Sequence, residues 1–148
     1  MGNIKVVHAN SNHKNFIVYA NKVIDETNNM NDTSNLEMNF EKDYLCENPK
    51  FQCLVAEYDE KPVGMILYSY FYWASDGQVL WISQMYIEPE YRKKGIFFEI
   101  IKKLREENKD IKIVSCATGN NNIRMQKILR FYNAHEMGNL KFYYKKTD

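Results

Sequence analysis

The sequence predicts an α/β (α+β) fold for residues 1–148, a single domain with a mixed, mostly antiparallel central sheet, one β-α-β crossover and helices on both faces. Two observations support this prediction. Residues 51–87 hold three consecutive segments rich in β-branched and aromatic residues, separated by turn residues, as in an antiparallel meander. An amphipathic helical segment then leads to a further apolar segment, and a strand reached through a helix runs parallel to the strand before it.

The first third of the chain predicts one strand and two helices. Asn3–Ala9 predicts the first strand. Residues 13–28 carry apolar residues at helical spacing, and the polar run Asn28–Asn35 ends that helix. Leu36–Asn48 predicts a second, weaker helix, because Pro49 lies just beyond it.

The remaining strands and helices follow the same reasoning. The predicted strands are Phe51–Asp59, Val63–Ala74, Val79–Ile87, Ile111–Ala117 and Leu140–Lys146. The helix after the third of these segments carries one apolar side, made of Ile96, Phe97, Ile100, Ile101 and Leu104. The last helix carries a stripe of Met125, Ile128, Leu129 and Tyr132.

Composition limits the classes of function. Apolar residues make up 45% and charged residues 26% of the chain, so a globular protein is expected. The formal net charge of +1 argues against a nucleic-acid partner, and the longest apolar run is too short to span a bilayer. The three cysteines and three histidines show no metal-ligand spacing, and an odd, scattered cysteine set fits a reduced cytoplasmic setting.

One glycine stands between a basic triplet and an apolar helix, in the segment Arg92-Lys93-Lys94-Gly95-Ile96-Phe97. A glycine inside a helix costs roughly 1 kcal/mol relative to alanine, so a different requirement explains its place. The end of a strand followed by the start of a helix offers unpaired backbone N–H groups and the positive end of a helix dipole. This segment is therefore a candidate anion site. The alternative is an ordinary turn glycine beside a solvated basic triplet.

The segment resembles the main motif of the GNAT superfamily of acetyl-CoA-dependent N-acyltransferases, Arg/Gln-x-x-Gly-x-Gly/Ala after a strand and at the start of a helix. The element order also resembles the family over nearly the whole chain. The resemblance implies that the pyrophosphate of acetyl-CoA, the co-substrate, binds Arg92, Lys93, Lys94, Gly95, Ile96 and Phe97. Phe97 departs from the family's small residue, and packing on the apolar stripe is its alternative role.

The resemblance also implies residues around the pantetheine arm and the thiol. Backbone groups at the end of the preceding strand, Met85, Tyr86 and Ile87, would bind the pantetheine amides. Asn122 matches a family Asn near the start of the last helix, and a helix N-cap is its alternative role.

The family commonly places a general-acid tyrosine seven positions after that Asn. In this register the position is Leu129. Tyr132 lies three positions later and is the candidate catalytic hydroxyl if the register shifts, with core packing as the alternative. Candidate bases are Ser83, Gln84 and Glu57.

These expectations add up to an N-acetyltransferase that moves an acetyl group directly from acetyl-CoA to a primary amine. The alternative is a non-catalytic, acyl-CoA-binding regulatory domain of the same fold. The expected partner is a small-molecule or peptide amine, with no nucleic acid and no membrane, and the expected state is a monomer or homodimer in the cytoplasm.

Overall fold

The computed structural model describes residues 2–28, 32–138 and 145. The chain divides into two compact units, Met1–Ala117 and Thr118–Asp148. In the part of the chain that the structure describes, the first unit holds the sheet and three α-helices, and the second holds one α-helix. The prediction of one domain over the whole chain stays a prediction.

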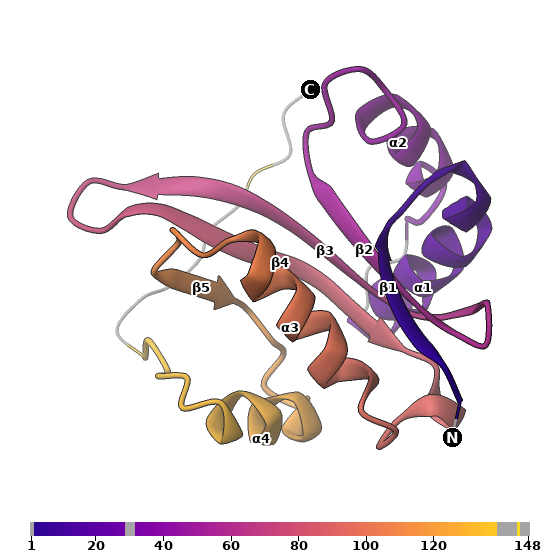
Figure 1. The fold of residues 1–148 in the computed structure, drawn as a ribbon. Coiled ribbons are helices and arrows are strands. Elements are labelled where there is room, and N and C mark those ends of the chain that lie inside the picture. Colours follow the sequence, from indigo (N-terminus) through magenta and orange to yellow (C-terminus); the bar gives the residue numbers. More distant parts are fainter. Residues whose placement is uncertain (1, 29–31, 139–144, 146–148) are drawn as a thin grey trace. The chain divides into compact units, whose positions relative to one another are not determined.

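A five-stranded sheet in the order β1-β2-β3-β4-β5 forms the centre of the first unit (Figure 1). The strands are β1 (Ile4–His8), β2 (Gln52–Tyr58), β3 (Lys61–Trp73), β4 (Gly77–Ile87) and β5 (Ile113–Cys116). The first four pair antiparallel in sequence order, and β5 pairs parallel to β4. The predicted meander and β-α-β crossover are both confirmed.

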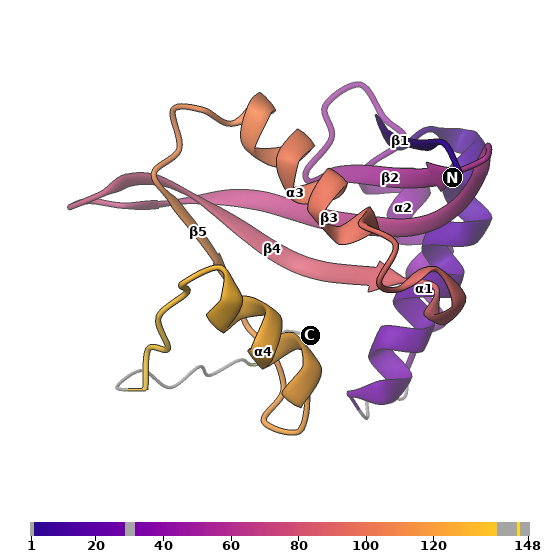
Figure 2. The same ribbon diagram turned by 60° about the horizontal axis from the view of Figure 1, so that its bottom comes forward.

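Helices cover both faces of this sheet, as predicted. They are α1 (Lys14–Thr27), α2 (Leu36–Asp43) and the crossover helix α3 (Ile96–Glu107). Two views of the ribbon show α3 lying along one face of the sheet and α1 on the other (Figures 1 and 2). None of the described helices is long and apolar enough to cross a membrane.

Several predicted boundaries shift. The second helix ends at Asp43, five residues before the predicted Asn48, and the backbone N–H of Lys50 then donates to the Asp43 carbonyl at 2.8 Å. The strand predicted at Ile111–Ala117 shortens to Ile113–Cys116, the part that pairs with β4. The final predicted strand, Leu140–Lys146, lies outside the described residues except for Lys145.

Alternating side chains of the strands divide the hydrophobic core into two clusters, because successive strand residues point to opposite faces. The cluster under α3 joins sheet residues such as Leu54 and Ile66 to Ile100 and Leu104. The cluster under α1 and α2 holds Ala9, Ile17, Ala20, Phe40, Tyr44, Cys53, Val55, Met65 and Tyr86. Fully burying each large aliphatic side chain stabilises the fold by about 1.5–3 kcal/mol.

Gly64 in β3 lets the start of α3 lie close to the sheet. A Cβ built on Gly64 would stand 3.3 Å from the Ile96 side chain, 3.3 Å from the Tyr86 carbonyl oxygen and 3.4 Å from the Ile100 side chain. The first turn of α3 therefore packs against backbone at this point, and Gly64 helps to fix where the helix begins.

The second unit contains α4 (Ile123–Phe131). Asn122 caps its start, since the Asn122 Oδ1 accepts from the Met125 backbone N–H at 3.1 Å. At its end Asn133 has φ +60°, and the Ala134 N–H reaches the Leu129 carbonyl at 3.0 Å. Asn133 thus takes, just past the helix, the left-handed conformation that glycine most often provides at helix ends.

We expect Gly64→Leu to lower the free energy of unfolding by about 1–3 kcal/mol, because the larger side chain overpacks the contact with Ile96. Gly64→Ala should cost less, since neighbours need to give by only a few tenths of an ångström. Urea denaturation measures both. Equal stability of Gly64→Leu and the parent would contradict the proposed close packing.

Candidate functional site

The loop between β4 and α3 has an unusual backbone conformation. After a 3-10 turn at Pro89–Tyr91, Lys93 takes φ +65° and Gly95 takes φ +82°. A non-glycine residue with positive φ is uncommon, and such residues gather at ligand-binding sites. These two left-handed residues, separated by Lys94, turn the chain sharply just before α3 begins at Ile96.

This curl leaves several backbone donors without an acceptor. Among the described residues, no acceptor is found for the backbone N–H groups of Lys94, Gly95 and Ile96. These groups lie at the N-terminus of a 12-residue helix, where the helix dipole places partial positive charge. Together they form a site suited to a phosphate or another anion.

The conformation of Gly95 explains why the sequence places a glycine here. Its φ of +82° strains any residue with a Cβ, whereas a Cβ built there would meet nothing within 4 Å. The requirement within the chain is therefore one of backbone conformation.

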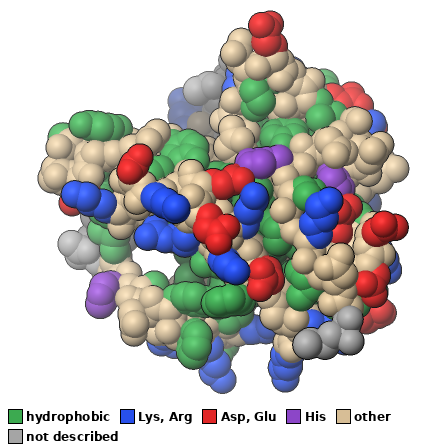
Figure 3. Space-filling view, in the orientation of Figure 1, with side chains coloured by type: hydrophobic (Ala, Val, Ile, Leu, Met, Phe, Trp, Pro, Cys, Tyr) green, Lys and Arg blue, Asp and Glu red, His purple; other side chains and the backbone are tan. Residues whose placement is uncertain are grey.

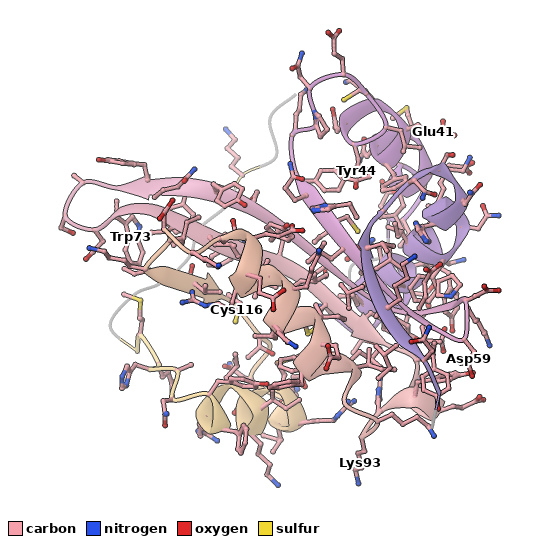
Figure 4. All side chains as sticks on the ribbon, viewed as in Figure 1. Glu41, Tyr44, Asp59, Trp73, Lys93 and Cys116 are labelled. Carbon is pink, nitrogen blue, oxygen red and sulfur yellow. The ribbon has the colours of Figure 1, made fainter. Side chains whose placement is uncertain are left out.

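Arg92 fastens the loop to the end of β4. Its Nε donates to the Ile87 carbonyl oxygen at 3.0 Å, so part of the guanidinium is engaged by the protein itself. Lys93 is exposed at the tip of the loop, where Figure 4 labels it. Phe97 packs against the core cluster under α3, which agrees with its alternative role as a packing residue.

Tyr58 of β2, distant in sequence, contacts Lys94, and Tyr91 packs against Tyr58. Lys94 Nζ lies 5.8 Å from the centre of the Tyr58 ring, and the Tyr58 and Tyr91 rings pack with centroids 5.2 Å apart. Lys61 Nζ lies 5.6 Å from the Tyr91 ring centre. Cation–π contacts of this kind contribute roughly 0.5–1 kcal/mol at exposed sites. The tyrosine pair therefore holds one loop cation beside the unpaired N–H groups.

Among the residues that the structure describes, the end of β4 has an open edge next to this loop. β5 pairs with β4 only from Val79 to Ile82, so it gives Met85 and Ile87 no partner. On the other edge, Glu88 N–H donates to the Val63 carbonyl at 2.8 Å. Antiparallel pairs alternate between bonded and non-bonded types, so the backbone groups of Met85 and Ile87 point to the open edge.

The same alternation turns the backbone of Tyr86 toward β3. Its side chain is buried against α1, and burial raises the pKa of its hydroxyl above the usual range, reinforced by Tyr19 and Glu88. Of the three residues predicted to bind pantetheine, Met85 and Ile87 retain groups at the open edge, while the Ile87 carbonyl already accepts from Arg92.

A β-bulge between β3 and β4 lies at the point where β4 separates from β5. Leu67 pairs with Gln84 and Tyr68 pairs with Ile82, so Ser83 is the extra residue on β4. The Ser83 hydroxyl donates to the Leu67 carbonyl at 3.3 Å. A bulge increases the local twist of a strand, which is consistent with the loss of β5 pairing beyond Ile82.

The carboxylate considered as a base is held by a histidine. Glu57 Oε2 lies 3.3 Å from Nε2 of the buried His13, whose Nδ1 accepts from the Asn10 N–H at 3.0 Å. Because Nδ1 accepts, Nε2 carries the proton and donates to Glu57. The pair secures the start of α1, a structural role that the sequence analysis missed.

The remaining predicted site residues belong to the second unit. Asn122 is the N-cap of α4, which confirms its alternative role without excluding the other. Leu129 lies in the last turns of α4, and Tyr132 is its C-cap with 42% of its surface exposed. The core packing considered for Tyr132 is therefore not seen among the described residues.

A metal site would need several ligating side chains close together among the described residues. No group of three or more His, Cys, Asp or Glu side chains there could hold a metal ion. Side chains of both signs are interspersed on the face that Figure 3 shows. The three cysteines are free, and burial raises the pKa of Cys53 and Cys116.

In this α/β protein, the end of β4 that β5 leaves unpaired lies next to a helix N-terminus suited to an anion. This arrangement suits an extended, anionic ligand. The model of the acetyltransferase (GNAT) family matches residues 21–135. The chain therefore belongs to the GNAT acetyltransferase family, and the family resemblance read from the motif is confirmed.

Curated relatives match over a shorter stretch. Thialysine N-epsilon-acetyltransferase of Sus scrofa is 41% identical over 68 residues, covering 40% of this chain and 40% of the relative. The Caenorhabditis elegans enzyme of the same name is 37% identical over 68 residues, covering 46% of this chain and 42% of the relative. The match thus spans less than half the length of these relatives.

Solved structures match over nearly the whole chain. A possible acetyltransferase from Clostridium difficile 630 is 25% identical, with a TM-score of 0.79 and coverage of 98% and 99%. A predicted acetyltransferase from Clostridium acetobutylicum, solved with acetyl-CoA, is 16% identical, with a TM-score of 0.74 and coverage of 96% of both chains. An aminoglycoside N-acetyltransferase in complex with CoA is 15% identical, with a TM-score of 0.78 and coverage of 99% and 97%. The last two support the fold alone.

We expect Gly95→Glu to abolish acetyl-CoA binding, because it places a negative charge beside the N–H groups that would bind the pyrophosphate. Gly95→Gln is the matched control. Glutamine has the same size as glutamate, and either residue destabilises the left-handed loop by about 1–2 kcal/mol. Calorimetry should show measurable binding for Gly95→Gln only. Equal affinity of the two variants would remove the loop from the site.

We expect Tyr58 to act on acetyl-CoA affinity through Lys94. Tyr58→Leu should weaken binding about two- to fivefold, the scale of one exposed cation–π contact, and Tyr58→Phe should not. In a Lys94→Ala background Tyr58→Leu should cost nothing further, and the dependence of affinity on salt should flatten. Additive effects of the two changes would show that Tyr58 acts by another route.

Proposed function

We propose that this protein is an N-acetyltransferase that transfers an acetyl group from acetyl-CoA directly to a primary amine. The observation that carries the proposal is the open edge of β4 next to a helix start with unpaired N–H groups. An amide-containing arm and a pyrophosphate are the two parts of acetyl-CoA that such groups can satisfy. Family membership supports the same assignment.

In this proposal the co-substrate lies along the first unit from the loop to the bulge. The pyrophosphate accepts hydrogen bonds from the backbone of Lys94, Gly95, Ile96 and Phe97, with Arg92 and Lys93 adding positive charge. The pantetheine amides pair with Met85 and Ile87 as an added strand would. Asn122 of α4 is proposed as a further contact.

The reaction needs little from the protein beyond positioning. The neutral amine attacks the thioester carbonyl, a C–N bond forms, the C–S bond breaks and CoA leaves as a thiolate or thiol. At pH 7 departure as a thiolate costs only about 2 kcal/mol, because the thiol pKa is about 8.5. The amine must lose one proton, since its pKa is about 10.4, and Ser83, Gln84 and Glu57 remain the proposed relay candidates.

The names of the relatives suggest two acceptor classes, a lysine-like amine and an aminoglycoside. A small-molecule or peptide amine is therefore the proposed partner. The free cysteines favour a reducing, cytoplasmic location, and a monomer or homodimer is the proposed state.

A second candidate function is a non-catalytic domain that binds acyl-CoA. It is favoured by Leu129, which occupies the position where the family carries a tyrosine. Incubation of the protein with acetyl-CoA and a panel of amines, followed by mass spectrometry, separates the two. Acetylated product supports the enzyme, whereas acetyl-CoA binding without any product supports the regulatory domain.

Variants at positions 129 and 132 distinguish the two candidate positions for a general acid. We expect Leu129→Tyr to change kcat more than Tyr132→Phe does, because the register through Asn122 puts position 129 beside the thiol. A general acid contributes about 10²–10⁴-fold. A loss of about a hundredfold in kcat for a folded Tyr132→Phe would instead identify Tyr132 as the donor.

A further inference from the structure

The chain just before β1 packs very closely on a tyrosine at the end of β2. The Gly2 backbone N–H donates to the Tyr58 hydroxyl oxygen at 3.0 Å. A Cβ built on Gly2 would stand 1.9 Å from the Tyr58 Cζ, 2.2 Å from its Cε1 and 2.3 Å from its hydroxyl oxygen. Real Cβ atoms essentially never show contacts under 3.0 Å. A side chain at position 2 therefore displaces either the Tyr58 ring or the backbone of Gly2.

Hydrogen bonds at the next residue hold that backbone in place. The Asn3 N–H donates to the Asp59 Oδ1 at 2.9 Å, and the Asp59 N–H donates to the Asn3 carbonyl oxygen at 3.0 Å. Pairing of β1 with β2 then begins at once, with Ile4 opposite Tyr58. The atoms that a Cβ at position 2 would meet belong to the far end of a side chain, which moves at lower cost than this paired backbone. The Tyr58 ring is therefore the part that gives way.

The turn after Tyr58 has an uncommon backbone that depends on the same hydrogen bonds. Asp59 takes φ +49° and Glu60 takes φ +70°, although neither is a glycine. Such conformations persist where the surrounding structure holds them. The two bonds to Asn3 supply part of that support, and Figure 4 labels Asp59 at this turn. The start of β1 and this turn thus hold each other in a fixed geometry.

The Tyr58 ring also links this turn to the loop before α3. Its ring packs on that of Tyr91 with centroids 5.2 Å apart, and Lys94 Nζ lies 5.8 Å from its centre. A cation–π contact requires the cation over the ring within about 6 Å of the centroid. The contact with Lys94 is close to that limit, so a small displacement of the ring is enough to break it. Position 2 is thereby coupled to position 94 through one side chain.

We propose that Gly2 is a positioning residue for acetyl-CoA. Because position 2 carries no side chain, the Tyr58 ring lies where it holds Lys94 beside the unpaired N–H groups of the phosphate loop. The inference rests on the proposed function for the identity of the anion that this loop binds. Gly2 touches no part of the co-substrate in this proposal and acts only through Tyr58 and Lys94.

NMR of the full chain with isotope-labelled lysine tests the coupling without any ligand. The Tyr58 ring current should displace the signal of the Lys94 ε-methylene group, which Lys94→Ala assigns by its loss. Gly2→Ala should move this signal most of the way to its position in Tyr58→Leu. Gly138→Ala is the matched control, because it adds the same methyl group where a Cβ would meet nothing within 4 Å. An unchanged Lys94 signal in Gly2→Ala would overturn the proposal.

Calorimetry with acetyl-CoA measures the effect on binding. Gly2→Ala should weaken affinity about two- to fivefold, the scale of the single exposed cation–π contact that it disrupts. In a Lys94→Ala or a Tyr58→Leu background it should have no further effect, because changes that act through one shared contact are not additive. A purely structural role of Gly2 would lower the urea midpoint and leave affinity additive with Lys94→Ala, and that result would contradict the proposal.

The two measurements separate this inference from the proposed function. A Lys94 signal that responds to Gly2→Ala in a protein that does not bind acetyl-CoA would keep the coupling between positions 2 and 94 and reject the proposed co-substrate. Acetyl-CoA binding and acetylation of amines that are both indifferent to Gly2→Ala would keep the N-acetyltransferase and reject the role of Gly2.

Discussion

The parallel pairing of β4 with β5 covers Val79 to Ile82 and then stops, and the candidate site depends on this short pairing. A strand edge with unpaired donors and acceptors is a liability in a folded protein, because it can pair with any other extended chain. Here β3 holds the other edge of β4 along nearly its whole length. The open edge is thus fixed in place, which is what a site for a flexible, amide-bearing arm requires.

Burial on both faces keeps that edge rigid. Tyr86 packs into the cluster under α1 and α2, and its neighbour Ile87 packs into the cluster under α3. Arg92 then returns from the loop to the Ile87 carbonyl, and Gly64 lets α3 begin close to the Tyr86 carbonyl. The open edge and the helix start are therefore held by the same few residues, so the two halves of the proposed co-substrate site keep a fixed spacing.

The parts of the fold and site that follow from local sequence could be predicted. The meander and the crossover depend on periodicity and on residue types at turns. The Tyr58–Tyr91 pair, the bulge at Ser83 and the bond of His13 to Glu57 join residues far apart in the chain or depend on strand register. No local pattern carries that information. The positive φ that explains the glycine at position 95 is likewise seen only in the folded loop.

The bulge at Ser83 lies where the pairing of β4 with β5 ends. The Leu67 carbonyl of β3 accepts the hydrogen bond of the Ser83 hydroxyl at 3.3 Å, and so ties β4 to β3 where the open edge of β4 begins. Holding two reactants in a reactive geometry can supply a large share of the lowering of a reaction barrier, about 7–11 kcal/mol in well-oriented intramolecular cases. In the proposed register Leu129 occupies the family's tyrosine position, so the proposed reaction depends correspondingly more on this positioning, because a leucine side chain cannot donate a proton. The rigid edge of β4 that begins at this bulge is therefore the feature on which the proposed chemistry most depends.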